Sequence, residues 1–492
     1  MLFLKIMLFS GVMIRYTKLL SRNPTFVQTR ASNQNVKVIL TIDDMPHPRS
    51  LPIFGTKIDL LAAGSGIKLH EYINKRHQQL GSIFYEQLSG KTKIVFISDP
   101  TAIKSLFLNL EGKYPAHILP DPWVLYEKLY GNKRGLFFMN GEEWLNNRRV
   151  MNPHLLKHNS EKWMLDPVLT TVDAFIKKWK NAAELDTFTP NLGSDFYRFS
   201  TDAIISILMG GNATSIKMNK HSEIMLDTFS ESVKRIFQTT TKLYGLPLEL
   251  FQRFNLKAWR DFKECVDTSL LQAQKIVADM LHIKNENEGL LKKLHEENLS
   301  DETITRIIAD FVIAAGDTTA HTLLWVIYLL SNHQEIIKEI RTRDIQYVKH
   351  VVNESMRLYP VAPFLTRILP KESVLSGYKL EKGTPVIASI YTSGRDDQYF
   401  SQADKFLPYR WDRSDLQKQN LANHIPSASL PFALGARSCI GKKLAMLQIT
   451  ELIYQIVNQF DLKCLNEREV KAITSQVLIP NEDITIAVSL RK

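Results

Sequence analysis

The spacing of apolar and polar residues predicts long helices separated by a few short strands. The clearest helix covers residues 301–332, where Ser300 precedes acidic residues and no proline interrupts the pattern that follows. Apolar residues lie on nearly every side of this segment, so we expect a buried, central helix. A second helical pattern follows Gly441 and continues to about Phe460.

Strands are predicted where short β-branched or apolar runs end at turn residues. Such runs occur at Ile94–Ile97, Tyr378–Leu380, Val386–Ile390 and Ile484–Val488. The remainder of the chain is typical of helices and their connecting loops. The sequence therefore predicts a mainly α fold with a minor β region.

The body of the chain shows no sign of division into separate domains. After the N-terminal segment it contains no linker rich in glycine, serine or proline, no low-complexity tract and no internal repeat. A chain of 492 residues is long enough to enclose a large cofactor. We therefore expect one large domain over residues 43–492.

The N-terminal segment is basic and contains no acidic residue as far as Ile42. Its longest uncharged run is Ile6–Ile14, much shorter than the roughly 20 residues that a membrane-spanning helix requires. Basic and hydroxylated residues without acids are typical of a mitochondrial transit peptide, which we predict for residues 1–42. An anchor for the endoplasmic reticulum, with a similar basic flank, is the alternative.

The net charge of +11 does not indicate binding to nucleic acid. Six of the basic residues lie within residues 1–42, and the rest of the chain carries 56 basic and 51 acidic residues. Because the body is close to balanced, we expect no nucleic-acid partner.

Cysteine use points to chemistry at one position. The chain has only Cys265, Cys439 and Cys464, too few for a disulfide framework and in keeping with a reducing compartment. Cys439 lies between Gly435 and Gly441, directly before a predicted helix. The helix dipole and the unpaired backbone N–H groups at that end favour the thiolate, which is the form of cysteine that binds iron.

The segment around Cys439 resembles the haem-binding motif of the cytochrome P450 family, F-x-x-G-x-R-x-C-x-G. The five fixed positions are matched by Phe432, Gly435, Arg437, Cys439 and Gly441. The resemblance runs from about Pro46 to the C-terminus and implies the P450 fold with a single haem domain, haem b as the cofactor and Cys439 as the iron ligand. It also implies that Phe432 belongs to the haem site and that Arg437 pairs with a haem propionate.

A buried structural triad is implied by further motifs of the same family. Glu354 and Arg357, three residues apart on one predicted helix face, match its E-x-x-R motif. Arg410, in the segment Pro408–Trp411, matches the later arginine to which this pair binds.

Two other segments resemble family contacts to the haem. Trp144 and Arg148 match a W-x-x-x-R helix whose side chains bind the haem propionates, and arginine suits paired carboxylates. Arg367 matches a further propionate contact of mitochondrial members.

The predicted central helix contains the sequence Ala-Ala-Gly-Asp-Thr-Thr at residues 314–319. Glycine and threonine are poor helix formers, and threonine hydroxyls that bond to preceding carbonyl groups bend helices. By resemblance, Asp317 and Thr318 match the acid–alcohol pair that relays protons on the side of the haem where dioxygen binds. Ala315 stands where the family usually has glycine. A helix kink without chemistry is the alternative.

The resemblance favours the mitochondrial branch, whose members receive electrons from NADPH through a ferredoxin reductase and a small acidic ferredoxin. Lys442 and Lys443 match its basic pair after the cysteine, and Lys349 matches one of its lysines before E-x-x-R. Asn353 and Met446 depart from the pattern. The branch implies a mitochondrial protein, peripheral to the inner membrane on the matrix side. Members in the endoplasmic reticulum use a flavoprotein reductase instead.

Stretches at 51–73, 134–149, 354–364 and 429–443 resemble arthropod ecdysteroid 2-hydroxylases of the Shadow type. This resemblance implies hydroxylation of 2-deoxyecdysone at carbon 2 to give ecdysone. An apolar segment that lines the substrate site in the family is matched by Val361, Ala362, Pro363 and Phe364.

Other functions stay open at this point. Another mitochondrial or microsomal member of the family could oxidise a different sterol or a xenobiotic. A member that rearranges peroxides without a reductase is disfavoured, because such enzymes often lack the acid–alcohol pair. A non-catalytic haem sensor or electron carrier is disfavoured, because it usually has a second protein ligand to the iron.

Overall fold

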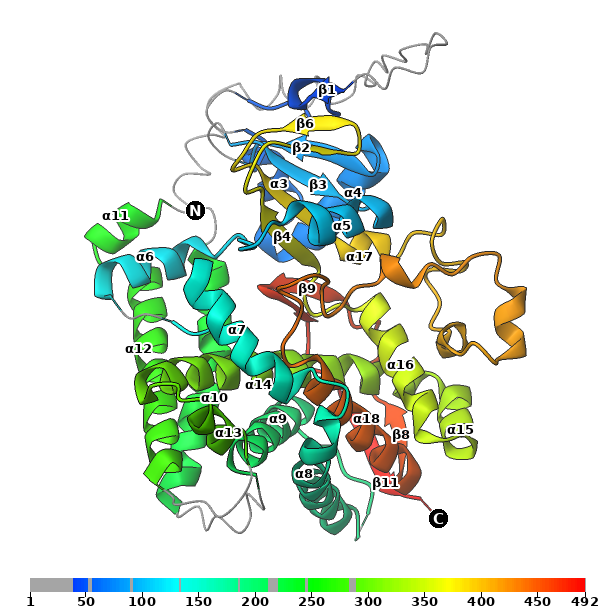
Figure 1. The fold of residues 1–492 in the computed structure, drawn as a ribbon. Coiled ribbons are helices and arrows are strands. Elements are labelled where there is room, and N and C mark those ends of the chain that lie inside the picture. Colours follow the sequence, from blue (N-terminus) through cyan, green and yellow to red (C-terminus); the bar gives the residue numbers. More distant parts are fainter. Residues whose placement is uncertain are drawn as a thin grey trace, which may run out of the picture. The chain divides into compact units, whose positions relative to one another are not determined.

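The computed structural model describes most of the chain after the N-terminal segment. The described residues are 39–51, 55–88, 92–131, 134–184, 186–210, 220–243, 247–282 and 289–491. The chain divides into two units, Met1–Ile39 and Leu40–Lys492, and the helices and strands labelled in Figure 1 belong to the second. The predicted transit peptide lies outside the described residues except for its last four, so it stays a prediction.

Helices make up the larger part of the second unit. Their bounds are α3 Lys57–Ala62, α4 Leu69–Leu80, α5 Pro100–Ser105, α6 Asp121–Tyr130, α7 Gly141–Leu155, α8 Ser160–Ala183, α9 Leu192–Met209, α10 Lys220–Leu243, α11 Leu248–Arg253, α12 Lys257–His282, α13 Leu290–Glu296, α14 Asp301–Asn332, α15 Gln334–Thr342, α16 Ile345–Leu358, α17 Ile390–Ser393 and α18 Lys442–Gln459.

The strands are short. Their bounds are β1 Leu40–Thr41, β2 Ile83–Glu86, β3 Ile94–Ile97, β4 Phe364–Ile368, β5 Ser373–Leu375, β6 Tyr378–Leu380, β7 Pro385–Ser389, β8 Phe460–Cys464, β9 Ala472–Ser475, β10 Val477–Pro480 and β11 Ile486–Leu490. The predicted fold class, mainly α with a minor β region, is confirmed.

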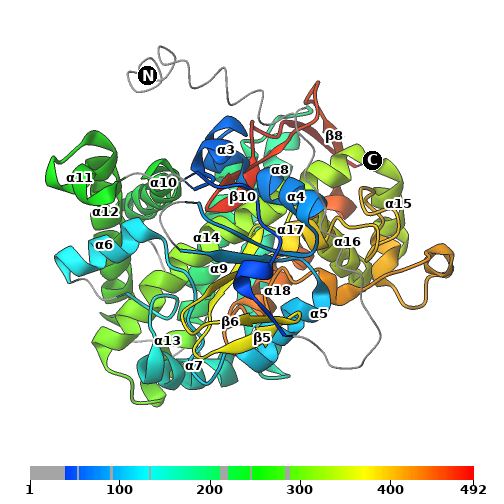
Figure 2. The same cartoon turned by 90° about the horizontal axis from the view of Figure 1, so that it is seen from above.

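The long helix α14 forms the centre of the helical part, as Figures 1 and 2 show. It packs against α9, α12, α16 and α18, and its bounds agree with the predicted 301–332. Ser300 caps its N-terminus by accepting a hydrogen bond from the Thr303 N–H at 3.3 Å. Burial on nearly all sides explains why its sequence lacks a polar face.

Among the described helices, α14 is long and apolar enough to cross a membrane, but 78% of its most apolar window is buried in the protein. It also carries two buried acids, Asp310 and Asp317. The carboxylate of Asp310 accepts a hydrogen bond from Arg134 Nε at 2.8 Å. Burial within the fold and a paired internal charge identify α14 as a core helix.

The largest sheet has the strand order β2-β3-β7-β4, and Figure 1 shows three of these strands together. β3 runs parallel to β7, whereas β2 and β4 pair with their neighbours in the antiparallel sense. In the outer strand β4, Arg367 lies opposite Val386 of β7. This register gives Arg367 a rigid support in the sheet.

Predicted strand positions agree with the structure where an apolar run coincides with the pairing. β3 and β6 have the predicted bounds, but β7 begins one residue before the predicted Val386–Ile390. β11 lies two residues beyond the predicted Ile484–Val488, because it pairs with β8 from Ile486 opposite Cys464 to Leu490 opposite Phe460. The partner strand, and not the apolar run, sets these ends.

Several histidines of the fold are neutral, among them the buried His70 and His77 and the half-buried His424. The Nδ1 of His77 lies 3.0 Å from the carbonyl oxygen of Gly81, which can only accept, so Nδ1 carries the proton. The Nε2 of His77 lies 3.0 Å from the Ser389 hydroxyl and therefore accepts. Burial lowers the pKa of His77, of His70 and of His424 to about 4 in each case. The charge of Glu71 opposes this fall in His70, whereas the charges of Lys418 and Arg410 add to it in His424.

We expect the melting temperature to fall as the pH is lowered from 6.5 towards 4. In this window the unfolded chain binds protons on these histidines and the folded protein does not, so acid favours unfolding. His77→Asn should reduce the pH slope of the unfolding free energy by about 1.4 kcal/mol per pH unit, the value for one proton. Calorimetry over this range measures the slope. The exposed His158→Asn variant is the control, and an unchanged slope in His77→Asn would contradict the assignment.

Candidate active site: an uncovered thiol beside an arginine cluster

The loop that carries Cys439 has a backbone conformation that its glycine determines. The Cys439 N–H donates to the Phe432 carbonyl at 2.8 Å, and the Ser438 N–H donates to the Gly435 carbonyl at 3.1 Å. Gly435 has a φ of +81°, and a Cβ at this position would lie 2.3 Å from the carbonyl oxygen of Phe107. Both observations exclude a side chain at Gly435, which accounts for glycine at this position of the motif.

The thiol of Cys439 lies deep within the fold, but no other group of the described residues covers it, so it is accessible. Burial raises the pKa of this thiol, and the backbone N–H of Gly441 and the charge of Arg148 oppose the rise. The helix α18 begins three residues later, at Lys442. A Cβ at Gly441 would lie 3.9 Å from Cε2 of Phe311 in α14, so the central helix passes close to this loop.

The other cysteines have different surroundings. Cys265 is buried in an apolar cluster with Trp259 and Phe262, and Cys464 is half-buried in strand β8. The structure thus distinguishes Cys439 as the cysteine that is both internal and accessible.

Three arginines from distant parts of the chain meet beside the cysteine loop. Arg148 of α7 donates from Nη2 to the Ser438 carbonyl at 2.7 Å. Arg367 of β4 donates from Nε to Glu111 Oε2 at 2.7 Å. Arg437 lies with its guanidinium carbon 4.4 Å from the ring centre of Trp144. We call Arg148, Arg367 and Arg437 the arginine cluster.

The charges of Arg148 and Arg367 destabilise the charge of Arg437. Burial, followed by the charges of Arg367 and Arg148, lowers the pKa of Arg437 to about 10. Burial also lowers the pKa of Arg148 to about 10. The nearby His117 stays neutral, because burial and the charges of Arg437 and Arg367 lower its pKa to about 3.

The arginine cluster is short of negative charge and of hydrogen-bond acceptors. Glu111 is the carboxylate that acts on it, so two of its three positive charges are uncompensated. Each arginine also keeps a buried nitrogen without a partner among the described residues, namely Arg148 Nε, Arg367 Nη2 and Arg437 Nε. Buried donors and charges of this kind are costly unless a ligand completes them. A ligand with two carboxylates satisfies both requirements.

Sequence reasoning missed Glu111 and His117. Glu111 also accepts a hydrogen bond from the Ala436 N–H at 2.8 Å and thereby ties the cysteine loop to Arg367. It is 256 residues from Arg367 along the chain, and no motif marks it. Only the fold brings these residues together.

The predicted acid–alcohol pair lies in an unbroken part of α14. The Thr318 hydroxyl donates to the Ala314 carbonyl at 2.9 Å, as expected for threonine within a helix. Ala314 is exposed and Thr318 is half-buried, although most of their neighbours in α14 are buried. The Asp317 carboxylate is buried, and its Oδ2 lies 3.5 Å from Nδ1 of His321.

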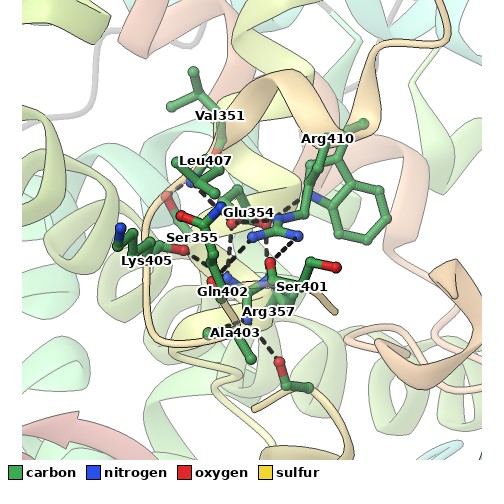
Figure 3. A network of polar contacts seen from close by, with 12 residues as sticks. Val351, Glu354, Ser355, Arg357, Ser401, Gln402, Ala403, Lys405, Leu407 and Arg410 are labelled. Atoms are coloured by element: carbon green, nitrogen blue, oxygen red, sulfur yellow. Dashed lines mark hydrogen bonds and ion pairs between the residues drawn. The ribbon is translucent and has the colours of Figure 1, made fainter. Parts of the chain in front are cut away.

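The predicted triad forms a buried network, which Figure 3 shows. Glu354 accepts from Arg357 Nη2 at 2.7 Å and from Arg410 Nε at 2.9 Å, and all three side chains are fully buried. Trp411 Nε1 donates to the same carboxylate at 2.8 Å. Burial alone would raise the pKa of Glu354, but the hydrogen bond and charge of Arg357 and the charge of Arg410 hold it below its ordinary value.

The remaining donors of the triad are bound to backbone carbonyl groups. Arg357 donates from Nη1 to Gly394 at 2.7 Å, and Arg410 donates from Nη1 to Ser401 at 3.1 Å. The network therefore fixes the loop between α17 and the segment Pro408–Trp411 onto helix α16. Its full burial and its bonds to backbone carbonyl groups indicate a structural role.

The residues predicted to meet a redox partner differ in their surroundings. Lys442 is exposed at the start of α18, and Lys349 is half-buried near Glu451. Lys443 is engaged within the protein, because its Nζ donates to the Lys157 carbonyl at 2.8 Å and pairs with Glu161 at 3.2 Å.

The predicted substrate-lining segment is held by its backbone. The Val361 carbonyl accepts from the Leu478 N–H at 2.8 Å, and the Pro363 carbonyl accepts from the Tyr391 N–H at 3.2 Å. Phe364 begins strand β4, and Ala362 and Phe364 are half-buried. The segment thus leads directly into the strand that carries Arg367.

Comparison with known proteins shows the family of this chain. Residues 45–488 match the cytochrome P450 family, and the chain belongs to that family. The predicted P450 fold is confirmed, and the protein is a haem monooxygenase of this class.

Its relatives include mitochondrial members of the family. The chain is similar to cytochrome P450 315a1, mitochondrial, of Drosophila melanogaster, with 36% identity over 91% of this chain and 88% of that protein. It is 27% identical to the mitochondrial 1,25-dihydroxyvitamin D(3) 24-hydroxylase of Rattus norvegicus over 91% and 89% of the two chains. It is 26% identical to the mitochondrial cholesterol side-chain cleavage enzyme of Equus caballus over 85% and 84%. The predicted mitochondrial localisation is confirmed.

Glu354→Ala should prevent the accumulation of folded protein. It leaves two buried guanidinium groups without their carboxylate, at a cost of about 3–5 kcal/mol in the free energy of unfolding. Expression yield and urea unfolding measure the effect. Glu372→Ala, which removes an exposed carboxylate paired with Lys379, is the control and should be neutral. A stable, haem-loaded but inactive Glu354→Ala protein would show that the residue acts in catalysis instead.

Proposed function

We propose that the protein hydroxylates a steroid, and specifically carbon 2 of 2-deoxyecdysone to give ecdysone. The observation that supports this proposal most is the accessible Cys439 thiol beside the arginine cluster. Two positive charges of this cluster have no compensating carboxylate among the described residues. The likeness of long stretches to arthropod ecdysteroid 2-hydroxylases supports the substrate. Two relatives whose names give a vitamin D derivative and cholesterol as substrates support the steroid class.

In this proposal the arginine cluster and the cysteine loop hold haem b. Arg148, Arg367 and Arg437 would bind its two propionates, because their unpaired donors and two uncompensated charges match a dianion. Cys439 would supply the thiolate that binds the iron, with Trp144 and Phe432 as further contacts. When bound, the haem activates dioxygen and inserts one oxygen atom into the substrate.

Thr318 and Asp317 would move protons on the α14 side of the site. The Thr318 hydroxyl is half-buried on the same helix face as the exposed Ala314, so it is available to a ligand. Asp317 is the adjacent buried acid that would return a proton to it. Val361, Ala362, Pro363 and Phe364 would border the steroid.

Electrons would arrive from NADPH through a ferredoxin reductase and an acidic ferredoxin. The exposed Lys442 begins α18, three residues after Cys439, so a partner bound there lies near the metal site. Lys349 would contribute to the same surface. Lys443 is already paired with Glu161, so it would add to the positive potential of this surface and would not contact the partner directly.

Peripheral contact with the inner mitochondrial membrane, on the matrix side, is supported by exposed apolar side chains around α11. Leu250, Phe254 and Leu256 are exposed by 50%, 66% and 41%, within a stretch of seven residues. Such a grouping is more apolar than an ordinary surface loop and suits the headgroup region of a bilayer.

The haem prediction can be tested with a modified cofactor. The apoprotein should bind haem and give the red-shifted Soret band of thiolate ligation when reduced with carbon monoxide bound. Haem dimethyl ester should bind at least about tenfold more weakly, because it lacks the two charges that the arginine cluster requires. Cys439→Ser should lose the shifted band and Cys464→Ala should keep it. Equal binding of the ester would contradict the propionate assignment.

Purified protein supplied with ferredoxin, its reductase and NADPH should convert 2-deoxyecdysone to ecdysone, as detected by mass spectrometry. The rate should fall as salt rises, because the ferredoxin contact is between opposite charges. Lys442→Glu should raise the apparent KM for ferredoxin more than it lowers kcat, whereas Lys275→Glu on the exposed face of α12 should change neither. Activity with a flavoprotein reductase alone, or turnover of another sterol in place of 2-deoxyecdysone, would contradict the proposal.

A further inference from the structure

Tyr197 of α9 packs directly against the central helix, next to the acid–alcohol pair. Its side chain is 8% exposed. A Cβ at Gly316 would lie 3.2 Å from both Cζ and Oη of Tyr197, so the tyrosine ring occupies the space that a side chain at Gly316 would take. Gly316 thus gives room to the Tyr197 hydroxyl beside Asp317.

Two buried polar atoms lack a hydrogen-bond partner at this place, although one of them, Asp317 Oδ2, lies 3.5 Å from Nδ1 of His321. The Oη of Tyr197 and the Oδ2 of Asp317 are both without a hydrogen-bond partner among the described residues. Asp317 is 2% exposed. Burial, and then the negative charges of Asp317 and Glu231, raise the pKa of Tyr197 well above its ordinary value, so Tyr197 remains a hydroxyl donor. A hydroxyl and a carboxylate oxygen that are buried near each other and unpaired are suitable partners for one water molecule.

Helix geometry places Asp317 between Tyr197 and Thr318. Successive residues of an α-helix point about 100° apart. Gly316 faces Tyr197, and Thr318 lies on the face of the exposed Ala314, roughly opposite. Asp317 lies between these two faces and is the residue through which a group on the α9 side can act on Thr318.

We propose that Tyr197 and Asp317 hold one buried water between Oη and Oδ2, and that this pair forms the inner end of the proton route to Thr318. The proposal rests on the proposed role of Thr318 and Asp317 as proton relay. It adds Tyr197 as a positioning and relay residue, and Gly316 as the residue that admits it.

The proton transfer is balanced at every group. Thr318 gives its hydroxyl proton to the oxygen-binding side of the site and takes one from Asp317. The Asp317 carboxylate takes that proton from the shared water, the water takes one from Tyr197, and the buried Tyr197 hydroxyl is reprotonated from the side of the exposed Glu231, whose charge acts on it. One proton crosses from solvent, and each group returns to its starting state. No tyrosinate accumulates, because the transfers are concerted.

A crystal structure of the haem-loaded protein tests the water directly, without reference to activity. We expect a water within about 3.2 Å of both Tyr197 Oη and Asp317 Oδ2, and its loss in Tyr197→Phe. A structure in which either atom is bonded to another protein group, or in which no such water is present, overturns the proposal.

Coupling measurements test the relay. Tyr197→Phe should release several-fold more peroxide per NADPH consumed and show a larger solvent deuterium isotope effect on product formation. Tyr328→Phe is the matched control, because Tyr328 is also 8% exposed and its hydroxyl accepts from the Val470 N–H at 3.0 Å, away from this pair. It should leave both quantities unchanged.

Thr318→Ala distinguishes a failure of the Tyr197 role from a failure of the proposed Asp317–Thr318 relay. If Thr318→Ala uncouples the enzyme and Tyr197→Phe behaves like Tyr328→Phe, the role of Tyr197 is wrong and the acid–alcohol pair stands. If Thr318→Ala is also fully coupled, the proposed proton relay of Asp317 and Thr318 is itself wrong.

Discussion

The repulsion that the buried Arg148 and Arg367 exert on the half-buried Arg437 is the constraint on which the site depends. Arg148, Arg367 and Arg437 come from a helix, a strand and a loop, and one carboxylate, Glu111, compensates them in part. Their positions are held by packing and backbone hydrogen bonds that oppose this repulsion. A dianionic ligand changes the balance, because all three arginines can pair with it and the repulsion on Arg437 is offset. Ligand binding and stability of the fold are therefore linked through this cluster.

The sequence predicted best those parts of the fold whose local pattern agrees with their tertiary surroundings. Helix α14 is apolar on nearly all sides because it is buried on nearly all sides, and its predicted bounds are confirmed. The observed strands β7 and β11 differ from their predicted bounds by one and two residues, because pairing with neighbouring strands decides where they end. That information lies in distant segments and not in the apolar run itself.

The candidate site likewise contains residues that a local motif predicts and residues that only distant contacts bring together. Motifs at short spacing predicted Cys439 together with Arg437, and Glu354 together with Arg357, whereas Arg410 came from a separate motif later in the chain. Glu111 and His117 follow no motif, and their roles arise from contacts across the fold with Arg367 and Arg437. Lys443 shows the reverse case, in which a residue at a motif position has partners inside the protein. Its pairing with Glu161 depends on how α8 packs beside α18.

The composition of α14 also bears on how the chain reaches its compartment. Before folding, a long apolar segment of this kind resembles the membrane spans that translocation machineries release sideways into the bilayer. Each aspartate at the centre of such a span costs about 2.5–3.5 kcal/mol. Asp310 and Asp317 therefore make lateral release unfavourable while the chain is unfolded. Once the protein folds, Arg134 pairs with Asp310, and the same charges that kept the segment out of the lipid are accommodated in the core.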